Sequence, residues 1–365
     1  MQAVTPVEVR DPLAAAHHPL ETRLGRRFAG MVRDTRDLPF VTLIFSALAV
    51  LVPLTVAMYL WPSPWLAVAY LAVLFVGFFD RYTLMLHCTS HRRLFVRRLD
   101  ALNQLVPIVL APFMGQTPYT YFAHHMGMHH PENNLPSDLS STMAYRRDSL
   151  RGFLRYFATF FFAGIFQLTR YHYVRRHWKM FRMALLGEAG WYLFVVALGF
   201  VSLPATLVVF VVPFVLCRFL MMAGNWTQHA FVDLADPGNP YRNSLTTINS
   251  RYNRRCFNDG YHIGHHVKAN RHWTEMPDDF LANLATYRDQ GAVVIDGLDY
   301  FQIWALLMLK RYKTLAAHYV ELGPTRRSEA EIIALLRERT RHTTRDAAAS
   351  LSGGLSGRTT GHAPL

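Results

Sequence analysis

Two pairs of apolar stretches restrict this chain to folds that cross a membrane. The first pair covers residues 39–61 and 65–79, and the break between them contains two prolines. The second pair covers residues 191–201 and 205–217, with Pro204 in the break. A transmembrane helix needs about 20 mainly apolar residues, and proline ends a helix at each break. The sequence therefore predicts an all-α integral membrane protein with two transmembrane helical hairpins, which makes four spans.

The positive charges predict which side of the membrane each segment faces. The chain has a formal net charge of +13, yet neither hairpin loop contains Lys or Arg. Positively charged residues, mainly Arg, are frequent in the first 38 residues, in residues 87–182 and after residue 223. Because positively charged loops stay in the cytoplasm, both termini should be cytoplasmic. We expect the protein to lie in a bacterial inner membrane. The partner expected for its basic surface is the anionic lipid bilayer, and no nucleic acid is expected.

Composition divides the chain further. We expect a cytoplasmic amino-terminal segment at 1–38, a membrane domain at 39–323, a charged helix at 324–345 and a disordered tail at 346–365. A capping box of Ser328 and Glu331 opens the charged helix. Two more apolar segments, 99–114 and 150–168, also contain charged or polar residues. They are interpreted as interfacial helices rather than as a fifth and a sixth span.

Histidine clusters are the second unusual feature of the chain. Ten of its 18 histidines fall in short motifs, which are His87-x3-His91, then His124, His125, His129 and His130, then His262, His265 and His266, with His229 four residues after Asn225. On a helix, residues i and i+4 share a face, so their imidazoles can reach one metal or two neighbouring metals. The motifs therefore predict a metal site.

The spacing places these histidines just beyond the membrane. A helix over residues 65–91 would rise roughly 40 Å and one over 205–229 roughly 37 Å, whereas the hydrocarbon core is about 30 Å thick. The histidines at these helix ends should lie on the cytoplasmic side. A cytoplasmic helical cap would hold a di-metal site there, with nine predicted ligands: His87, His91, His125, His129, His130, His229, His262, His265 and His266.

The ligand types narrow the class of metal site. The motifs contain no cysteine ligand and no Glu-x-x-His, which disfavours a structural zinc site and a carboxylate-bridged di-iron site. Imidazole suits iron, copper, zinc and nickel, so ligand type alone does not select the metal. A metal transporter would need its ligands near the bilayer midplane. A zinc hydrolase, acting through a metal-bound hydroxide, stays open as another class.

The pattern resembles the integral membrane fatty acid desaturase and hydroxylase superfamily. The resemblance covers residues 87–276 and the preceding hairpin, and the segment 258–266 is especially similar. It implies a di-iron oxidoreductase with two Fe ions, O2 as co-substrate and a fatty acyl substrate, as free acid or thioester. It also implies that Asn225 reaches a metal through water. Asp259 and His272 are further candidates for contact with a metal or its ligands, and no other catalytic or cofactor-binding residue is predicted.

The motifs depart from the desaturase pattern in the second cluster, so that His124 and His125 are alternative ligands. Desaturation is the first expectation, with hydroxylation and oxidative decarboxylation to a terminal alkene as alternatives. No electron-carrying domain is evident, so we expect an external donor such as ferredoxin with its reductase on the basic face.

An apolar channel for the acyl chain is also expected. Its candidate lining residues, for each of which ordinary helix packing is the commoner explanation, are Phe78, Tyr82, Met85, Met221, Met222 and Trp226. Arg81 and Arg218 are expected to contact a headgroup, to pair with Asp80 and Glu188, or to extend towards the lipid phosphates.

Overall fold

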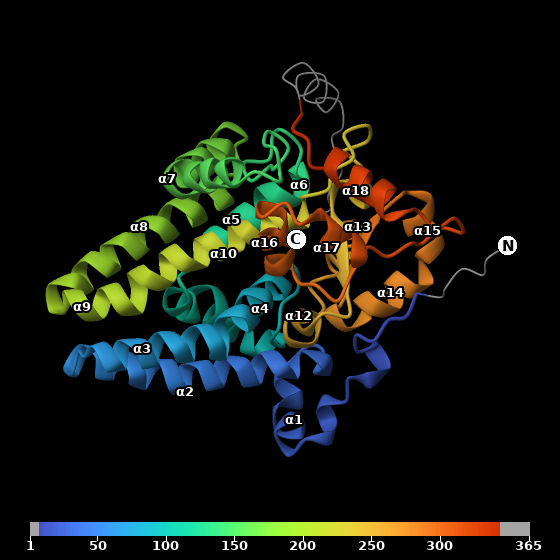
Figure 1. Cartoon of the computed structure of the whole chain (residues 1–365). Coiled ribbons are helices and arrows are strands. Elements are labelled where there is room, and N and C mark those ends of the chain that lie inside the picture. The colour runs from blue at the N-terminus through green and yellow to red at the C-terminus, as the bar shows by residue number, and fades with distance from the viewer. Residues whose placement is uncertain (1–6, 344–365) are drawn as a thin grey trace.

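A computed structural model describes residues 7–343, so the predicted disordered tail at 346–365 lies outside the described residues. Among the described residues, four helices are long and apolar enough to cross a membrane: Thr35–Leu60, Pro64–His91, Trp178–Val201 and Leu203–Gln228. They form two hairpins whose turns both lie at the left of Figure 1, while the carboxy-terminal helices gather at the right. The helical fold class and the four predicted spans are confirmed.

The first hairpin joins α2 (Leu38–Leu60) to α3 (Pro64–Ala72). A π-helical stretch, Val73–Phe79, continues α3 into α4 (Asp80–His91). The hydroxyl of Ser63 caps α3 by accepting a hydrogen bond from the backbone N–H of Leu66. This cap satisfies one of the free N–H groups at the start of the helix. Together with the neighbouring prolines, Ser63 therefore forms a sharp turn between the two helices.

The second hairpin joins α8 (Trp178–Val201) to α9 (Leu203–Thr206), which continues through a π-helical stretch, Leu207–Val211, into α10 (Val212–Gln228). Helix α8 begins well before the apolar run at 191–201. Its first half contains charged residues, which interrupt the apolar pattern but not the helix.

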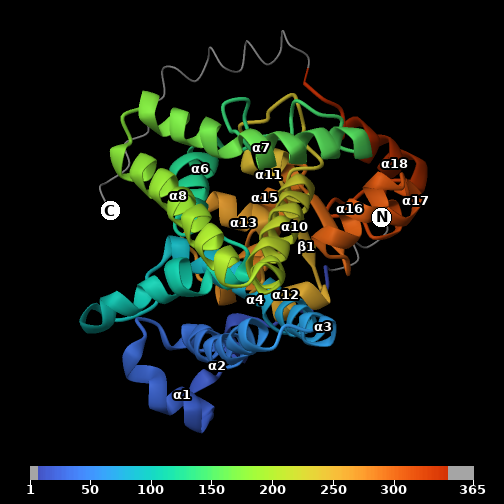
Figure 2. The same ribbon diagram turned by 90° about the vertical axis from the view of Figure 1, so that its left-hand side faces the viewer.

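A long helix and a set of short turns flank the hairpins. Helix α7 (Leu150–Val174) packs along α8 and crosses the top of Figure 2. It is not among the candidate spans, and its Phe162 and Phe166 are exposed. Residues 97–114 form helical turns that bury Val106 and Met114 against the first hairpin: Arg97–Gln104, Leu105–Leu110 and Pro112–Met114.

The remaining elements build the cap. Its helices are α5 (Thr120–His124), α6 (His130–Glu132), α11 (Pro240–Asn243), α12 (Arg251–Arg255), α13 (His262–Val267), α14 (Met276–Ala282), α15 (Leu284–Asp289), α16 (Tyr300–Met308), α17 (Tyr312–Ala317) and α18 (Glu329–Glu338), with α1 (Arg23–Phe28) ahead of the first hairpin. The Ser328–Glu331 capping box is present at α18. Two strands, β1 (Leu245–Ile248) and β2 (Val293–Asp296), pair in parallel. Each strand is only four residues long, too short for the sequence pattern to predict this pair.

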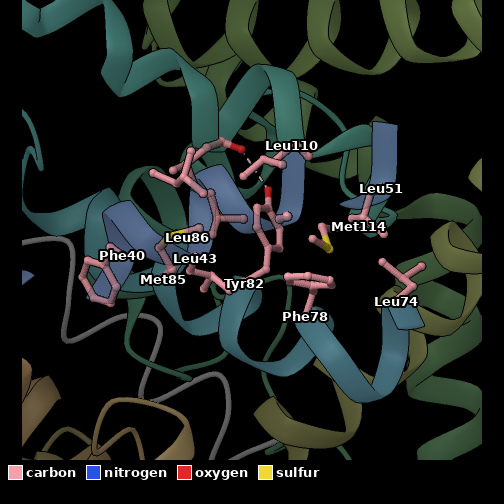
Figure 3. Close-up of a cluster of buried hydrophobic side chains, with 14 of the residues drawn as sticks. Phe40, Leu43, Leu51, Leu74, Phe78, Tyr82, Met85, Leu86, Leu110 and Met114 are labelled. Carbon is pink, nitrogen blue, oxygen red and sulfur yellow. Dashed lines mark hydrogen bonds between the residues drawn. The ribbon is translucent and has the colours of Figure 1, made fainter. Parts of the chain in front are cut away.

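The core between the first two spans decides how three of the candidate channel residues are used. Phe78, Tyr82 and Met85 pack against side chains of α2 such as Leu43 (Figure 3), and the hydroxyl of Tyr82 donates to the backbone oxygen of Val106 at 3.0 Å. Each fully buried aromatic or Met side chain contributes about 1.5–3 kcal/mol to folding. These three residues therefore stabilise the first hairpin and do not line a channel.

Both ends of the described chain are tied to the cap. The carboxylate of Asp11 accepts hydrogen bonds from the hydroxyl of Tyr261 and the amide of Asn253, at 2.7 and 2.8 Å. The fully buried guanidinium of Arg147 donates to the backbone oxygens of Ala230 and Arg339. Burial lowers the pKa of Arg147 to about 9. These contacts join segments that are far apart in the sequence around the histidine motifs.

Candidate metal centre

Nine histidines form two groups. The five-histidine group consists of His87, His91, His125, His130 and His265, and the four-histidine group consists of His129, His229, His262 and His266. Within each group, one ring nitrogen from every histidine lies within 4.8 Å of the others. The structure therefore brings together all nine of the predicted ligands, and it places His125, not His124, in a group.

A π-helical turn sets the geometry of the second motif. The segment His125–His129 links α5 to α6 and is π-helical. In a π-helix the hydrogen bonds join residues five apart, so such residues share a face. His125 and His130 are five apart, and their Nε2 atoms lie 3.0 Å from each other. The unusual spacing of this motif thus suits the five-histidine group.

The two consecutive His-His pairs connect the groups. Neighbouring residues of a helix point about 100° apart, because each turn takes 3.6 residues. His129 belongs to the four-histidine group and His130 to the five-histidine group, and His266 and His265 divide in the same way. Each pair thereby contributes one imidazole to each group and holds the groups side by side.

The spacing of the ring nitrogens fits metal ligation. Metal–nitrogen bonds of about 2.1 Å place two ligand nitrogens about 3.0 Å apart at a right angle and about 3.4 Å apart at a tetrahedral angle. The Nε2 atom of His265 lies 2.9 Å from that of His87 and 3.0 Å from that of His130. In the four-histidine group, the Nε2 atom of His262 lies 2.9 Å from that of His266 and 3.4 Å from that of His229. Both groups have the size of a shell around one cation.

Hydrogen bonds at Nδ1 orient three of the imidazoles. His129 lies 2.7 Å from the Asp138 carboxylate, and His87 lies 3.1 Å from the Asp259 carboxylate. His229 lies 2.8 Å from the backbone oxygen of Asn243. Such acceptors fix the proton on Nδ1 and leave a lone pair on Nε2. The lone pairs then point at one another, an arrangement that a shared cation would stabilise.

Seven of the nine imidazoles are held in the neutral form that metals require. Burial, and then the neighbouring imidazoles, lower the pKa of His262, His265 and His266 well below the ordinary value for histidine. Burial lowers the pKa of His229 to about 3. Neutral imidazole is the metal-binding form, so the groups present ready ligands near pH 7.

The other predicted site residues lie outside the two groups. Asp259 bonds His87, and the amide nitrogen of Asn225 donates to the backbone oxygen of Ser140 and to the hydroxyl of Tyr156. His124 lies on the wall of a cavity beside the groups. The Nε2 atom of His272 lies 3.0 Å from a carboxylate oxygen of Asp37, in a network with Asp34 and Thr274.

Asp138 is a site residue that sequence reasoning missed. Its carboxylate is fully buried and also accepts hydrogen bonds from the backbone N–H groups of Asn134 and Ser140. Burial acts to raise the pKa of Asp138, but His129 and Ser140 hold it well below the usual range. The only sequence signal was an acidic residue shortly after the second motif, which did not distinguish it from other loop acids.

A cavity of about 460 Å³ connects the histidines to the membrane helices. His125 of the five-histidine group and His129 and His262 of the four-histidine group line it. The rest of its wall is mainly apolar and includes Phe75, Phe79, Phe160, Leu168, Met221 and Met222. Of the expected channel residues, the two methionines thus line the cavity, whereas Trp226 packs against Phe153 and Tyr156.

Of the two ion pairs expected near the cavity, one forms and the other does not. Asp80 pairs with Arg255, while the guanidinium of Arg81 donates to the backbone oxygen of Gly77. Arg218 pairs with Glu188 at 2.7 Å, and both side chains are buried. Of the expected pairs, therefore, the one between Arg218 and Glu188 is present.

Four apolar spans and nine gathered histidines define an integral membrane, metal-binding protein. The family model for fatty acid desaturases matches residues 62–297, which include both hairpin turns, all four histidine motifs and Asp138. The chain belongs to the fatty acid desaturase family and is an oxidoreductase of fatty acyl chains. No curated protein and no solved structure matches it.

Proposed function

We propose that this protein is a non-haem di-iron enzyme that desaturates a fatty acyl chain with O2. The observation that carries the proposal is the apolar cavity lined by members of both histidine groups. Iron bound there would supply the redox chemistry that O2 needs to attack an unactivated C–H bond, whereas zinc has no accessible redox step. The two groups fit two such ions in number of ligands and in nitrogen spacing.

The protein's own residues have three tasks in this reaction. Asp138 and Asp259 hold ligand imidazoles by their Nδ1 atoms, which keeps the Nε2 lone pairs directed inward. The aromatic and aliphatic wall of the cavity holds the acyl chain in an extended form beside the histidines and excludes water. Neutral His262 and His265 keep the site free of protons that would compete with metal.

The orientation proposed for the protein places the histidine groups and both termini in the cytoplasm of a bacterial cell. The span Pro64–His91 begins at one hairpin turn and ends at His91, and the span Leu203–Gln228 begins at the other turn and ends beside His229. The histidines therefore lie at the ends opposite the uncharged turns. This position favours an oxidase over a metal transporter, whose ligands belong at the bilayer midplane.

The electron donor proposed is a ferredoxin with its reductase. An acidic donor would meet the exposed basic residues Arg93, Arg97, Arg98, Arg175, Arg176 and Lys179. Arg92, also basic and near the first motif, lies partly buried between Asp34 and Asp37 and is a structural residue instead.

Product analysis tests the proposal. Reduced membranes containing the protein would be incubated with a panel of fatty acids and thioesters, with and without O2, and products identified by mass spectrometry. Desaturation removes two hydrogens, hydroxylation adds one oxygen, and oxidative decarboxylation removes one carbon. Membranes with the His262→Ala/His265→Ala variant are the control, because it removes a ligand from each group. Absence of any O2-dependent product from all substrates would overturn the proposal.

A further inference from the structure

An ion pair lies within the membrane-spanning part of the second hairpin. Glu188 is on α8 (Trp178–Val201) and Arg218 is on α10 (Val212–Gln228), each ten residues from the end nearer the histidines. Ten residues of helix rise about 15 Å, so the pair lies inside the candidate spans, about that far from the histidine end. Charged residues inside a membrane span are costly and commonly mark a functional site.

The contacts of the pair show that it is fixed in place. The Arg218 guanidinium donates to Glu188 at 2.7 Å and lies 4.2 Å above the ring of Phe214. The hydroxyl of Thr117 donates to the same oxygen of Glu188 at 2.6 Å. The side chains of Arg218 and Glu188 are only 12% and 4% exposed, so Arg218 does not extend towards lipid phosphates.

The same pair forms part of the cavity wall. Glu188 and Arg218 line the cavity together with Thr120 and His124 and with His125 of the five-histidine group. The mainly apolar cavity thus contains a charged pair, which lies ten residues along α10 from the end near the histidines. A chain that reaches the histidines can also extend past this region.

Four polar atoms of this region lack a hydrogen-bond partner within the described chain. They are one carboxylate oxygen of Glu188, Nε of Arg218, the hydroxyl of Thr120 and Nε2 of His124. The set contains both donors and acceptors. Buried polar groups without partners destabilise a protein, so a bound group that both donates and accepts would be favoured here.

The charge balance selects the chemistry of that group. Glu188 and Arg218 already neutralise each other, so a carboxylate added here would bury a net negative charge in the membrane. A carbonyl oxygen would only accept and would leave the Glu188 oxygen unpaired. We propose that this region binds a neutral hydroxyl group on the lipid substrate, remote from the carbon that is oxidised. The inference rests on the proposed function, and it names hydroxylated acyl chains as the substrate class.

Equilibrium binding to the purified holoenzyme tests the inference without requiring turnover. The probes are stearate and hydroxystearates with the hydroxyl at successive positions along the chain. One position should bind about tenfold more tightly than stearate, as one additional satisfied hydrogen bond allows. Equal affinity for stearate and for every hydroxystearate would overturn the inference. Failure to form any product would count against the proposed function, but would leave this binding result intact.

A double substitution identifies the region. The Glu188→Leu/Arg218→Met variant removes both charges together, because loss of one alone leaves an unpaired buried charge that threatens folding. It should bind stearate at least as well as the unsubstituted protein and lose the tenfold preference. The control is Tyr59→Phe, which removes a hydrogen bond to Thr206 in the spans away from the cavity and should keep the preference. A double variant that still binds one hydroxystearate about tenfold more tightly than stearate would contradict the assignment of the hydroxyl site to Glu188 and Arg218.

Discussion

Asp138 accepts a hydrogen bond from Nδ1 of His129 at 2.7 Å, and the two side chains are almost completely buried. Two backbone N–H groups and the hydroxyl of Ser140 hold the Asp138 carboxylate in turn. The orientation of one imidazole in the four-histidine group therefore depends on a loop carboxylate that is not itself in either group.

Replacing Asp138 with asparagine should weaken metal binding. The amide can present its NH2 to Nδ1 of His129 and shift the ring proton to Nε2, where it blocks the lone pair. Loss of such a partner typically costs 10–100-fold in metal affinity. Iron titration of the metal-depleted protein measures this change. The control is Asp148→Asn, a buried carboxylate that pairs with Arg146 and Tyr312 and contacts no histidine. Equal affinity in Asp138→Asn and the unsubstituted protein would show that the pair has no role in metal binding.

The two groups should lose metal separately. His262→Ala removes one of four imidazoles and His265→Ala one of five, so the first should lose more metal from its own group. Each variant should retain at least one bound iron per chain, and the double variant should retain almost none. Elemental analysis of the purified proteins gives the number of iron ions bound per chain.

A histidine outside both groups provides the comparison for these variants. His177 is exposed and belongs to neither group, so His177→Ala should keep the metal content of the unsubstituted protein. If His265→Ala matched His177→Ala in iron content, the assignment of His265 as a ligand would be wrong.

The choice between His124 and His125 can be decided by a matched pair of substitutions. His125 has its Nε2 atom 3.0 Å from those of His91 and His130, whereas His124 faces the cavity region near Phe160. His125→Ala should lower the iron content, and His124→Ala should preserve it while changing substrate affinity. The reverse result, iron lost only on substitution of His124, would require a different arrangement of the second motif.

Metal removal should destabilise the fold. A ligand that binds only the folded state stabilises it, by about 2.7 kcal/mol at one hundred times its dissociation constant. The nine imidazoles come from α4, the π-helical turn, α6, the end of α10 and α13, so metal would join segments distant in sequence. We expect chelation to lower the Tm in detergent by about 5 °C or more. The His262→Ala/His265→Ala variant should show a much smaller change on chelation, and an equal change would point to effects of the chelator elsewhere.

The sequence predicted the spans and the histidine motifs because both depend on short-range patterns. The apolar run at 39–61 can be recognised from neighbouring residues alone, and the same is true of the spacing from His262 to His266. The pairing of β1 with β2, the contact of Asp11 with Tyr261 and the role of Asp138 depend on segments that meet only in the folded chain. No local pattern marks such contacts, so they could not be predicted.

The same distinction explains the residues expected along the channel. Helical spacing placed Phe78, Tyr82 and Met85 on the second span, but spacing alone does not reveal what lies opposite a face. In the structure α2 occupies that face, and the cavity lies on the side of Met221 and Met222. The sequence thus predicted the helix, but not which of the candidate residues pack in the core and which line the cavity.

Filling the cavity should shorten the acyl chain that the protein accepts. Gly164 on α7 lines the cavity, and a Cβ there would meet only the ring of Phe160, at an ordinary 3.5 Å. Gly164→Leu would therefore fold and project into the space of about three methylene groups, which costs the longest chains roughly 2 kcal/mol, or about 30-fold in affinity. Chain-length profiles of binding and turnover measure this shift.

Gly190 on α8 is the matched control for this last substitution. It is exposed, and a Cβ there would meet nothing within 4 Å. Gly190→Leu adds the same volume to a membrane helix outside the cavity, so its chain-length profile should match that of the unsubstituted protein. If both variants changed the profile equally, altered packing of the helices would explain the result. If neither did, the acyl chain would have to bind somewhere other than beside Gly164, and the cavity next to the histidines would not be the substrate site.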